Sequence, residues 1–89
     1  MAVLVKILNR GMSLDTYDQI APRLLPELKR QTGFHMHLCN SIEDGLVVRE
    51  VWDTAEQQRA WFEGYVRPNI PPDARPEIEV VELHNVEAK

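Results

Sequence analysis

The clearest pattern in the chain is a pair of segments, within residues 33–53, that predict a β-hairpin. The first arm alternates apolar side chains with polar or small ones: Phe34, Met36 and Leu38 against His35, His37 and Cys39. The second arm, residues 46–52, is rich in β-branched residues, which favour strands. Asp44-Gly45 lies between the arms and marks the turn.

The turn decides which residues of the two arms are neighbours. Asp44-Gly45 favours a type I′ turn, because glycine adopts positive φ without strain, and this turn places Glu43 opposite Leu46. Counting back along both arms gives three further pairs: Leu38 with Val51, Cys39 with Glu50, and His37 with Trp52. We therefore expect one apolar face and one face that carries an imidazole, a thiol, a carboxylate and an indole.

The segments on either side of the hairpin predict two helices. Ser13 is a good N-cap for the first, in which Pro22 should cause a kink or a break because proline donates no backbone hydrogen bond. Thr54 and Gln57 match a capping box that begins the second helix, and Pro68 ends it. The inward stripe of the second helix, which we assign to the core, is Ala55, Gln58, Trp61, Phe62 and Tyr65.

Residues 2–8 and 77–85 predict the first and last strands, so the order of elements is β-α-β-β-α-β. No repeat or linker divides residues 1–89, which we interpret as a single domain. Two right-handed crossovers joined by a hairpin predict a ferredoxin-like α+β fold, a four-stranded antiparallel sheet with both helices on one face. The apolar side of the hairpin, Phe34, Met36, Leu38 and Val51, should lie under the helices, and the side with His37 and Trp52 should face away.

Composition narrows the range of partners. The net charge is −4 and the ten Lys and Arg residues are scattered, which argues against nucleic-acid binding. No apolar run approaches the roughly 20 residues of a membrane span, and the first segment is too short for a signal peptide. The single cysteine, Cys39, forms no intrachain disulfide, which fits a reducing compartment. We expect a cytoplasmic protein that binds neither nucleic acid nor membrane.

Three stretches resemble small stand-alone members of the dimeric α+β barrel superfamily, and in particular its antibiotic-biosynthesis-monooxygenase-like branch. These stretches are H-L-C-N-S-I-E-D-G-L-V-V-R-E-V-W-D-T at residues 37–54, the aromatic second helix around Trp61 and Phe62, and L-H-N-V at residues 83–86. The resemblance implies a homodimer in which two sheets pack face to face. It also implies a ligand held between helices and sheet or inside the barrel. Some members oxidise polycyclic aromatic compounds without metal or flavin.

Other members of the superfamily degrade haem with an asparagine, a tryptophan and a histidine of the second helix. Asn9 and Trp52 could match the first two, but the second helix of this sequence, residues 55–66, has no histidine. This difference argues against haem, and we expect no cofactor.

His37 is the candidate catalytic residue, because a neutral imidazole can act as a general base near neutral pH. The alternative is a half-buried histidine that is hydrogen-bonded across the sheet or the dimer. The residues expected to line a ligand pocket with it are Trp52, Glu50, Cys39, His35 and His84. Three histidines would suffice for a metal site, but nothing in their spacing fixes one, and we expect no metal.

Three functions stay open at this point. The first is a cofactor-independent oxygenase acting on an aromatic or polyketide-like compound, and the second is a non-catalytic protein that binds such a ligand. The third is a structural dimerisation module. No G-x-S-x-G, P-loop or G-x-G-x-x-G motif supports a serine hydrolase or a nucleotide-binding protein.

Overall fold

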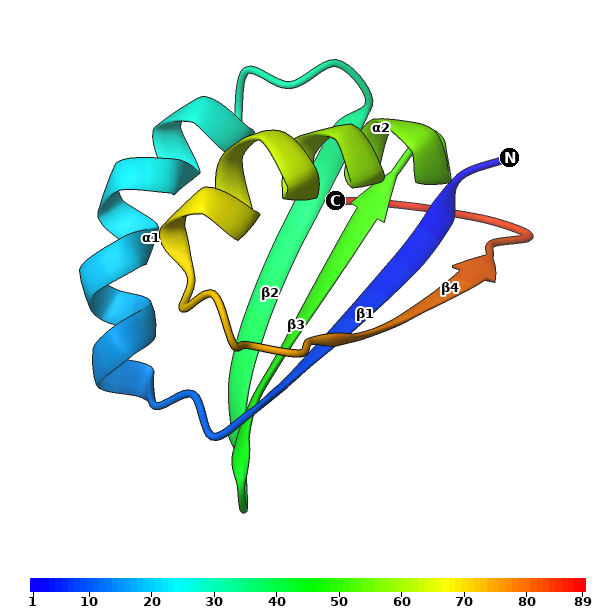
Figure 1. The fold of residues 1–89 in the computed structure, drawn as a ribbon. Coiled ribbons are helices and arrows are strands. Elements are labelled where there is room, and N and C mark those ends of the chain that lie inside the picture. The colour runs from blue at the N-terminus through cyan, green and yellow to red at the C-terminus, as the bar shows by residue number, and fades with distance from the viewer.

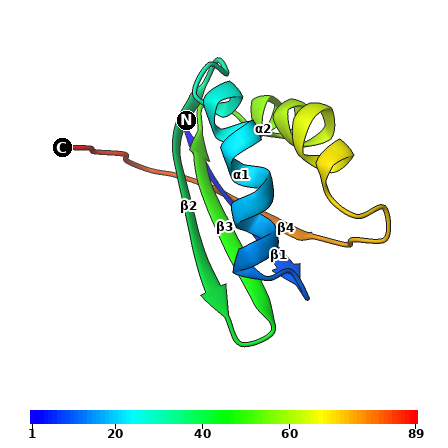
Figure 2. The ribbon, with the colours of Figure 1, turned by 90° about the vertical axis from the view of Figure 1, so that its left-hand side faces the viewer.

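The computed structural model describes all 89 residues, and its elements follow the predicted order. They are β1 (Val3–Arg10), α1 (Leu14–Leu28), β2 (Phe34–Ile42), β3 (Gly45–Trp52), α2 (Ala55–Trp61), the π-helical turn η1 (Phe62–Val66), the 3-10 turn η2 (Arg67–Asn69) and β4 (Glu77–Glu82). The strands form one antiparallel sheet in the order β2-β3-β1-β4. Both helices cover the same face of this sheet (Figures 1 and 2), which confirms the predicted ferredoxin-like fold. Neither helix has the length and apolar character needed to cross a membrane.

Both helices begin with the predicted caps. The Ser13 hydroxyl accepts a hydrogen bond from the Thr16 backbone N–H, and Thr54 and Gln57 form the reciprocal capping box. Of the two outcomes predicted at Pro22, a kink or a break, the break is wrong, because α1 continues through Pro22 and Pro26. Both prolines lie on the exposed side of α1, where water can solvate the backbone carbonyls that lose a donor.

The hairpin register differs from the predicted one. Ile42 pairs with Gly45, so the two-residue loop is Glu43-Asp44, and Gly45 has no positive φ. Gly45 is needed for a different reason, since a Cβ there would lie 2.2 Å from the backbone oxygen of Asn9 in the neighbouring strand. The pairing is shifted by two residues, since His37 faces Glu50 instead of Trp52, so the side chains keep their faces but change their partners.

The new register brings His37 opposite Glu50 instead of Trp52, and Cys39 opposite Val48. An irregularity between Phe34 and Met36 then moves Phe34 to the other face, opposite Trp52. The Phe34 ring meets the Trp52 indole edge to face, with centroids 5.5 Å apart.

The prediction of which hairpin face lies under the helices is also wrong. Met36 and Leu38 are 42% and 54% exposed, whereas Glu50 and Trp52 are almost completely buried beneath the helices. Val51 shares the outer face with Met36 and is partly buried.

The charges on β1 and β3 explain this orientation. Lys6 pairs with Arg49 on the outer face, and burying both cations under the helices would be costly without partners. The inner face of these strands carries one charged group, Glu50, together with the largest apolar side chain, Trp52.

The core lies between the helices and the three strands β1, β2 and β3. Its fully buried members include Val5, Leu28, Leu46 and Trp52, and Trp61 is 3% exposed. The predicted inward stripe of the second helix is confirmed at Gln58, Trp61 and Phe62, whereas Tyr65 is partly exposed and stacks on Trp61.

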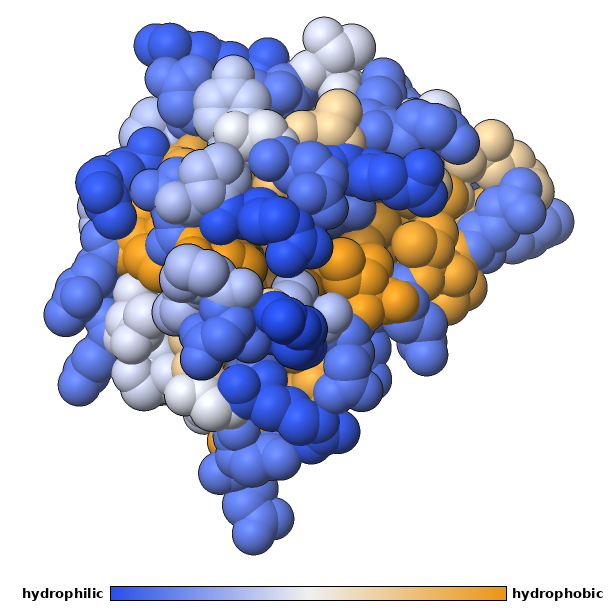
Figure 3. Space-filling view, in the orientation of Figure 1, coloured by the Kyte–Doolittle hydropathy of each residue, from blue (hydrophilic) through white to orange (hydrophobic).

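The helices leave β4 uncovered. Ile78 and Val80 pair with the buried Ile7 and Val5, so they lie on the helix side of the sheet, yet both are exposed. Figure 3 shows hydrophobic residues gathered beside α2, over β1 and β4. The last strand ends at Glu82, three residues earlier than predicted. The tail that follows leaves the domain on the side of the sheet opposite the helices (Figure 2).

Candidate functional site

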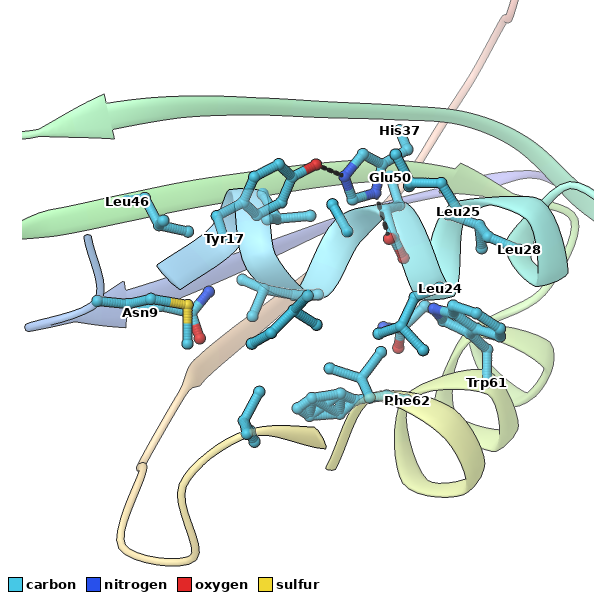
Figure 4. A pocket seen from close by; sticks show the side chains of 18 residues that line it. Asn9, Tyr17, Leu24, Leu25, Leu28, His37, Leu46, Glu50, Trp61 and Phe62 are labelled. Carbon is cyan, nitrogen blue, oxygen red and sulfur yellow. Dashed lines mark hydrogen bonds and ion pairs between the residues drawn. The ribbon is translucent and has the colours of Figure 1, made fainter. Parts of the chain in front are cut away.

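A cavity of about 80 Å³ lies between the helices and the sheet, and 14 of the 18 residues that line it are hydrophobic. Its walls come from β1, β2, β3, α1 and the continuous α2–η1 segment (Figure 4). The polar residues in this lining are Asn9, His37, Glu50 and Gln58. An apolar cavity with a few polar groups is the usual form of a small-molecule site.

Four side chains form one hydrogen-bonded series along this cavity. The Tyr17 hydroxyl lies 2.7 Å from His37 Nε2, and His37 Nδ1 lies 2.7 Å from Glu50 Oε2 (Figure 4). Trp52 Nε1 donates to the second carboxylate oxygen, Glu50 Oε1, at 3.0 Å. Tyr17 comes from α1, His37 from β2, and the other two from β3.

The chemistry of the end groups sets the direction of these hydrogen bonds. An ionised Glu50 carboxylate only accepts, so His37 carries its proton on Nδ1 and donates it to Oε2. In the neutral imidazole Nε2 is then an acceptor, and the Tyr17 hydroxyl donates to it. The buried Glu50 carboxylate therefore has two donors, which offset the cost of removing it from water.

The Tyr17 phenol keeps its proton over the physiological range. Partial burial raises the pKa of Tyr17 to about 12, with smaller contributions from the charges of Cys39, Glu50 and Asp18. Desolvation disfavours the anionic form, and the nearby negative charges disfavour it further.

Gln58 is the buried polar group of the cavity whose side-chain nitrogen lacks a partner. It is 4% exposed, and its side-chain nitrogen Nε2 has no hydrogen-bond acceptor. A buried donor without an acceptor costs about 1–3 kcal/mol. An oxygen atom of a bound molecule, or an ordered water, would remove this cost.

The predicted site residues are only partly brought together. His37 and Glu50 meet and line the cavity, as expected of a shared site. Trp52 is bonded to Glu50 but is completely buried behind it and does not line the cavity. Cys39 packs against the core outside the cavity lining, and burial, followed by the Asp18 charge, raises the pKa of its thiol.

The other two histidines lie elsewhere. His35 is exposed and hydrogen-bonded to Asp53, with 2.6 Å between His35 Nε2 and Asp53 Oδ1. His84 is exposed in the segment after β4. The three histidines are not neighbours, and no group of three or more His, Cys, Asp or Glu side chains is placed to hold a metal ion.

Sequence reasoning missed two polar residues of the site, Tyr17 and Gln58. Tyr17 occupies an apolar-stripe position of α1, and nothing in its spacing indicates that its hydroxyl reaches His37. Gln58 did leave a signal, because it is the one amide in the inward stripe of the second helix. Asn9, which was considered only in connection with haem, also lines the cavity.

Comparison with known proteins defines the fold more closely. No protein-family model and no curated protein sequence matches this chain. Among solved structures, the chain is similar to SnoaB, a cofactor-independent oxygenase from Streptomyces nogalater, with a TM-score of 0.69 and 14% identity over 99% of this chain and 97% of that one. It is also similar to a presumed antibiotic biosynthesis monooxygenase from Deinococcus radiodurans, with a TM-score of 0.52 and 14% identity over 100% and 98% of the two chains.

A designed protein has the same fold. De novo designed protein Foldit4 matches with a TM-score of 0.64 and 16% identity over 94% of this chain and all of that one. These neighbours confirm the ferredoxin-like α+β fold of the single chain, and the name of the Deinococcus radiodurans protein is that of the class the sequence resembles. Because a designed protein shares the fold, the activity has to be argued from the side chains of the site.

Proposed function

We propose that this protein binds an apolar aromatic molecule in the helix–sheet cavity and oxidises it with dioxygen, in the manner of a cofactor-independent monooxygenase with His37 as the base. The observation that carries the proposal is the unpaired Gln58 side-chain nitrogen in a cavity lined mainly by hydrophobic residues. This amide suits a carbonyl oxygen, and the Tyr17–His37–Glu50 series, on another wall, suits an acidic proton that ends on His37. Aromatic ketones and related polyketide-like compounds carry both groups.

The size of the cavity sets a condition on binding. A cavity of about 150 Å³ is known to hold benzene, so about 80 Å³ is too small for an aromatic ring. A ring-sized ligand therefore requires the cavity walls to move apart. The π-helical turn Phe62–Val66 lies in these walls, and such turns are frequent at functional sites.

Anthrone is a suitable substrate with which to test the proposal. A base removes a proton to give the enolate, the enolate carbon reacts with dioxygen, and the resulting peroxide loses water. One oxygen atom enters anthraquinone as a carbonyl, and the other leaves as water. We expect dioxygen consumption and anthraquinone formation to match each other and to exceed the rate without protein.

Two variants distinguish the cavity from the exposed hydrophobic surface over β4. Ala21→Leu adds a larger side chain to the cavity lining and should abolish binding and turnover. Val80→Ser removes exposed apolar surface outside the cavity and should change neither. Binding without dioxygen consumption would favour a carrier over an enzyme. Anthrone that does not bind, or binds equally well to Ala21→Leu, refutes the proposed site.

We also propose that the outer face of the sheet pairs two copies of the chain. The sequence predicts that the hairpin side with Trp52 forms this outer face, where Val48 and Trp52 would be exposed and would favour a dimer; this is wrong because both are buried. The outer face instead exposes Met36, Leu38 and Val81, and uncovered apolar sheet surface of this kind is typical of an interface.

Light scattering should therefore give about twice the 10.3 kDa mass of the chain. Leu38→Glu should give a folded monomer, because this side chain is 54% exposed in the single chain. A wild-type monomer at micromolar concentration would contradict the pairing.

A further inference from the structure

Both ring nitrogens of His37 already have partners. Nδ1 lies 2.7 Å from Glu50 Oε2, and Nε2 lies 2.7 Å from the Tyr17 hydroxyl. An imidazole has no third nitrogen, so no lone pair of His37 is left to accept a proton directly from a bound molecule. The ring also stacks with Tyr17 at an angle of 16° between their planes, so the two side chains are held as a pair.

Tyr17 is differently placed. With His37 neutral and protonated on Nδ1, the Tyr17 hydroxyl donates to Nε2, so its oxygen keeps lone pairs that can accept a hydrogen bond. Tyr17 lines the cavity beside His37 (Figure 4). A phenolic or enolic hydroxyl in the cavity can therefore donate to this oxygen without breaking any hydrogen bond of the series.

We propose that Tyr17 is the catalytic residue that takes the proton from the bound molecule, that His37 receives the proton of Tyr17, and that Glu50 is the positioning residue that fixes the His37 tautomer. The substrate class is a phenol or an enolisable aromatic ketone in its enol form. This inference deepens the proposed function and rests on it for the identity of the cavity as the site.

The proton balance of the step is simple. The ligand O–H bond breaks as its proton bonds to the Tyr17 oxygen, while the Tyr17 O–H bond breaks as its proton bonds to His37 Nε2. The ligand becomes an anion, Tyr17 ends neutral, and His37 becomes a cation next to the Glu50 carboxylate. The anion is left hydrogen-bonded to the Tyr17 hydroxyl, and the cation is stabilised by an opposite charge at contact distance.

Burial supports a relay over a free tyrosinate. Because the pKa of Tyr17 is about 12, almost no tyrosinate exists near neutral pH, so the phenol can act as a base only by giving up its own proton at the same time. Its acceptor, His37 Nε2, is in place at hydrogen-bond distance.

Two variants separate the roles of the residues. Tyr17→Phe keeps the ring and removes the oxygen. Glu50→Gln keeps the shape and the bond from Trp52, but its amide N–H₂ donates to Nδ1 and moves the histidine proton to Nε2. His37 would then donate to Tyr17 and could no longer receive its proton. Long-range ¹H–¹⁵N spectra should show the Nδ1–H tautomer in the wild type and the Nε2–H tautomer in Glu50→Gln.

The probe for proton transfer is 4-nitrophenol, a single-ring phenol whose absorption spectrum reports its ionisation. We expect the ratio of ionised to neutral probe, at the same pH, to be at least about tenfold higher for the probe bound to the wild type than for the free probe, which corresponds to one pKa unit. Tyr17→Phe and Glu50→Gln should bind the probe without this shift. The matched control Tyr65→Phe, outside the cavity lining, should behave as the wild type.

With anthrone, Tyr17→Phe should lower kcat by about 100-fold or more, the usual contribution of a general base. If His37 instead acts directly and Tyr17 only covers it, Tyr17→Phe frees Nε2 and raises both probe ionisation and turnover, which overturns the relay. A wild type that does not bind or ionise 4-nitrophenol overturns it as well. A wild type that ionises the probe through Tyr17 but consumes no dioxygen with anthrone supports the relay and refutes the oxygenase.

Discussion

Replacing Gln58 with leucine should stabilise the protein while weakening ligand binding. Gln58 is 4% exposed, and its Nε2 donor has no acceptor. Leucine is similar in size and in helix propensity, so the substitution changes little except the polar end of the side chain. Most substitutions at buried positions destabilise, so a gain here would identify a group that the fold alone does not need.

The expected gain follows from the unpaired donor. Removing a buried, unsatisfied amide relieves about 1–3 kcal/mol, and we take about 2 kcal/mol as the central value. In a domain of this size each kcal/mol moves the melting temperature by about 4–8 °C, so Gln58→Leu should melt about 8–16 °C higher than the wild type.

Thermal and urea unfolding followed by circular dichroism would measure this difference. The matched control is Gln57→Leu, the same substitution one residue earlier. The Gln57 side chain accepts from the Thr54 backbone N–H, so its loss should lower stability by about 1 kcal/mol. A general gain from adding leucine to this helix would raise both variants. If Gln58→Leu is neutral or less stable than the wild type, the amide is satisfied in solution and the main support for a ligand is lost.

Two further predictions concern the core and the tyrosine. Trp61→Ala should lower the free energy of unfolding by about 3–5 kcal/mol, because Trp61 is 3% exposed in the main core cluster. Far-ultraviolet circular dichroism should then show a largely unfolded chain, and a melting temperature within a few degrees of the wild type would contradict this. The pKa of the Tyr17 phenol should be about 12 instead of 10.0, as measured by tyrosinate absorbance in Tyr65→Phe, which leaves Tyr17 as the one tyrosine. Because the folded state holds this proton more tightly, the contribution of Tyr17 to stability is complete below pH 10 and disappears as the pH rises to about 12. A titration midpoint near 10 would show that the phenol is neither buried nor hydrogen-bonded.

Local patterns predicted the fold well. The caps at Ser13 and Thr54 lie where the sequence placed them, because capping depends on neighbours within three residues. The four-stranded antiparallel sheet with both helices on one face followed from the β-α-β-β-α-β pattern and from the handedness of crossovers. Both features depend on short-range chemistry or on general rules of chain topology.

The hairpin shows where local patterns fail. The Asp44-Gly45 pair predicts a turn, yet Gly45 is the first residue of β3. Glycine is needed there because β1 passes too close to leave room for a Cβ. The helix-facing side was misassigned because the hairpin was considered without β1, whose Lys6 shares a face with Arg49. The series from Tyr17 to Trp52 joins three elements, and its geometry depends on the register that the turn did not reveal.

The same cavity holds both groups that are expensive for the fold, the unpaired Gln58 amide and the buried Glu50 carboxylate. His37 and Trp52 donate hydrogen bonds to the Glu50 carboxylate, whereas no acceptor in the chain pairs with Gln58 Nε2. A ligand that supplies an oxygen to Gln58 should therefore stabilise the wild type by RT ln(1 + [L]/Kd) and stabilise Gln58→Leu much less. At saturating anthrone the difference in melting temperature between the two proteins should shrink or reverse. An equal shift in both would show that the ligand makes no use of the amide, and Gln58 would then have no part in recognition.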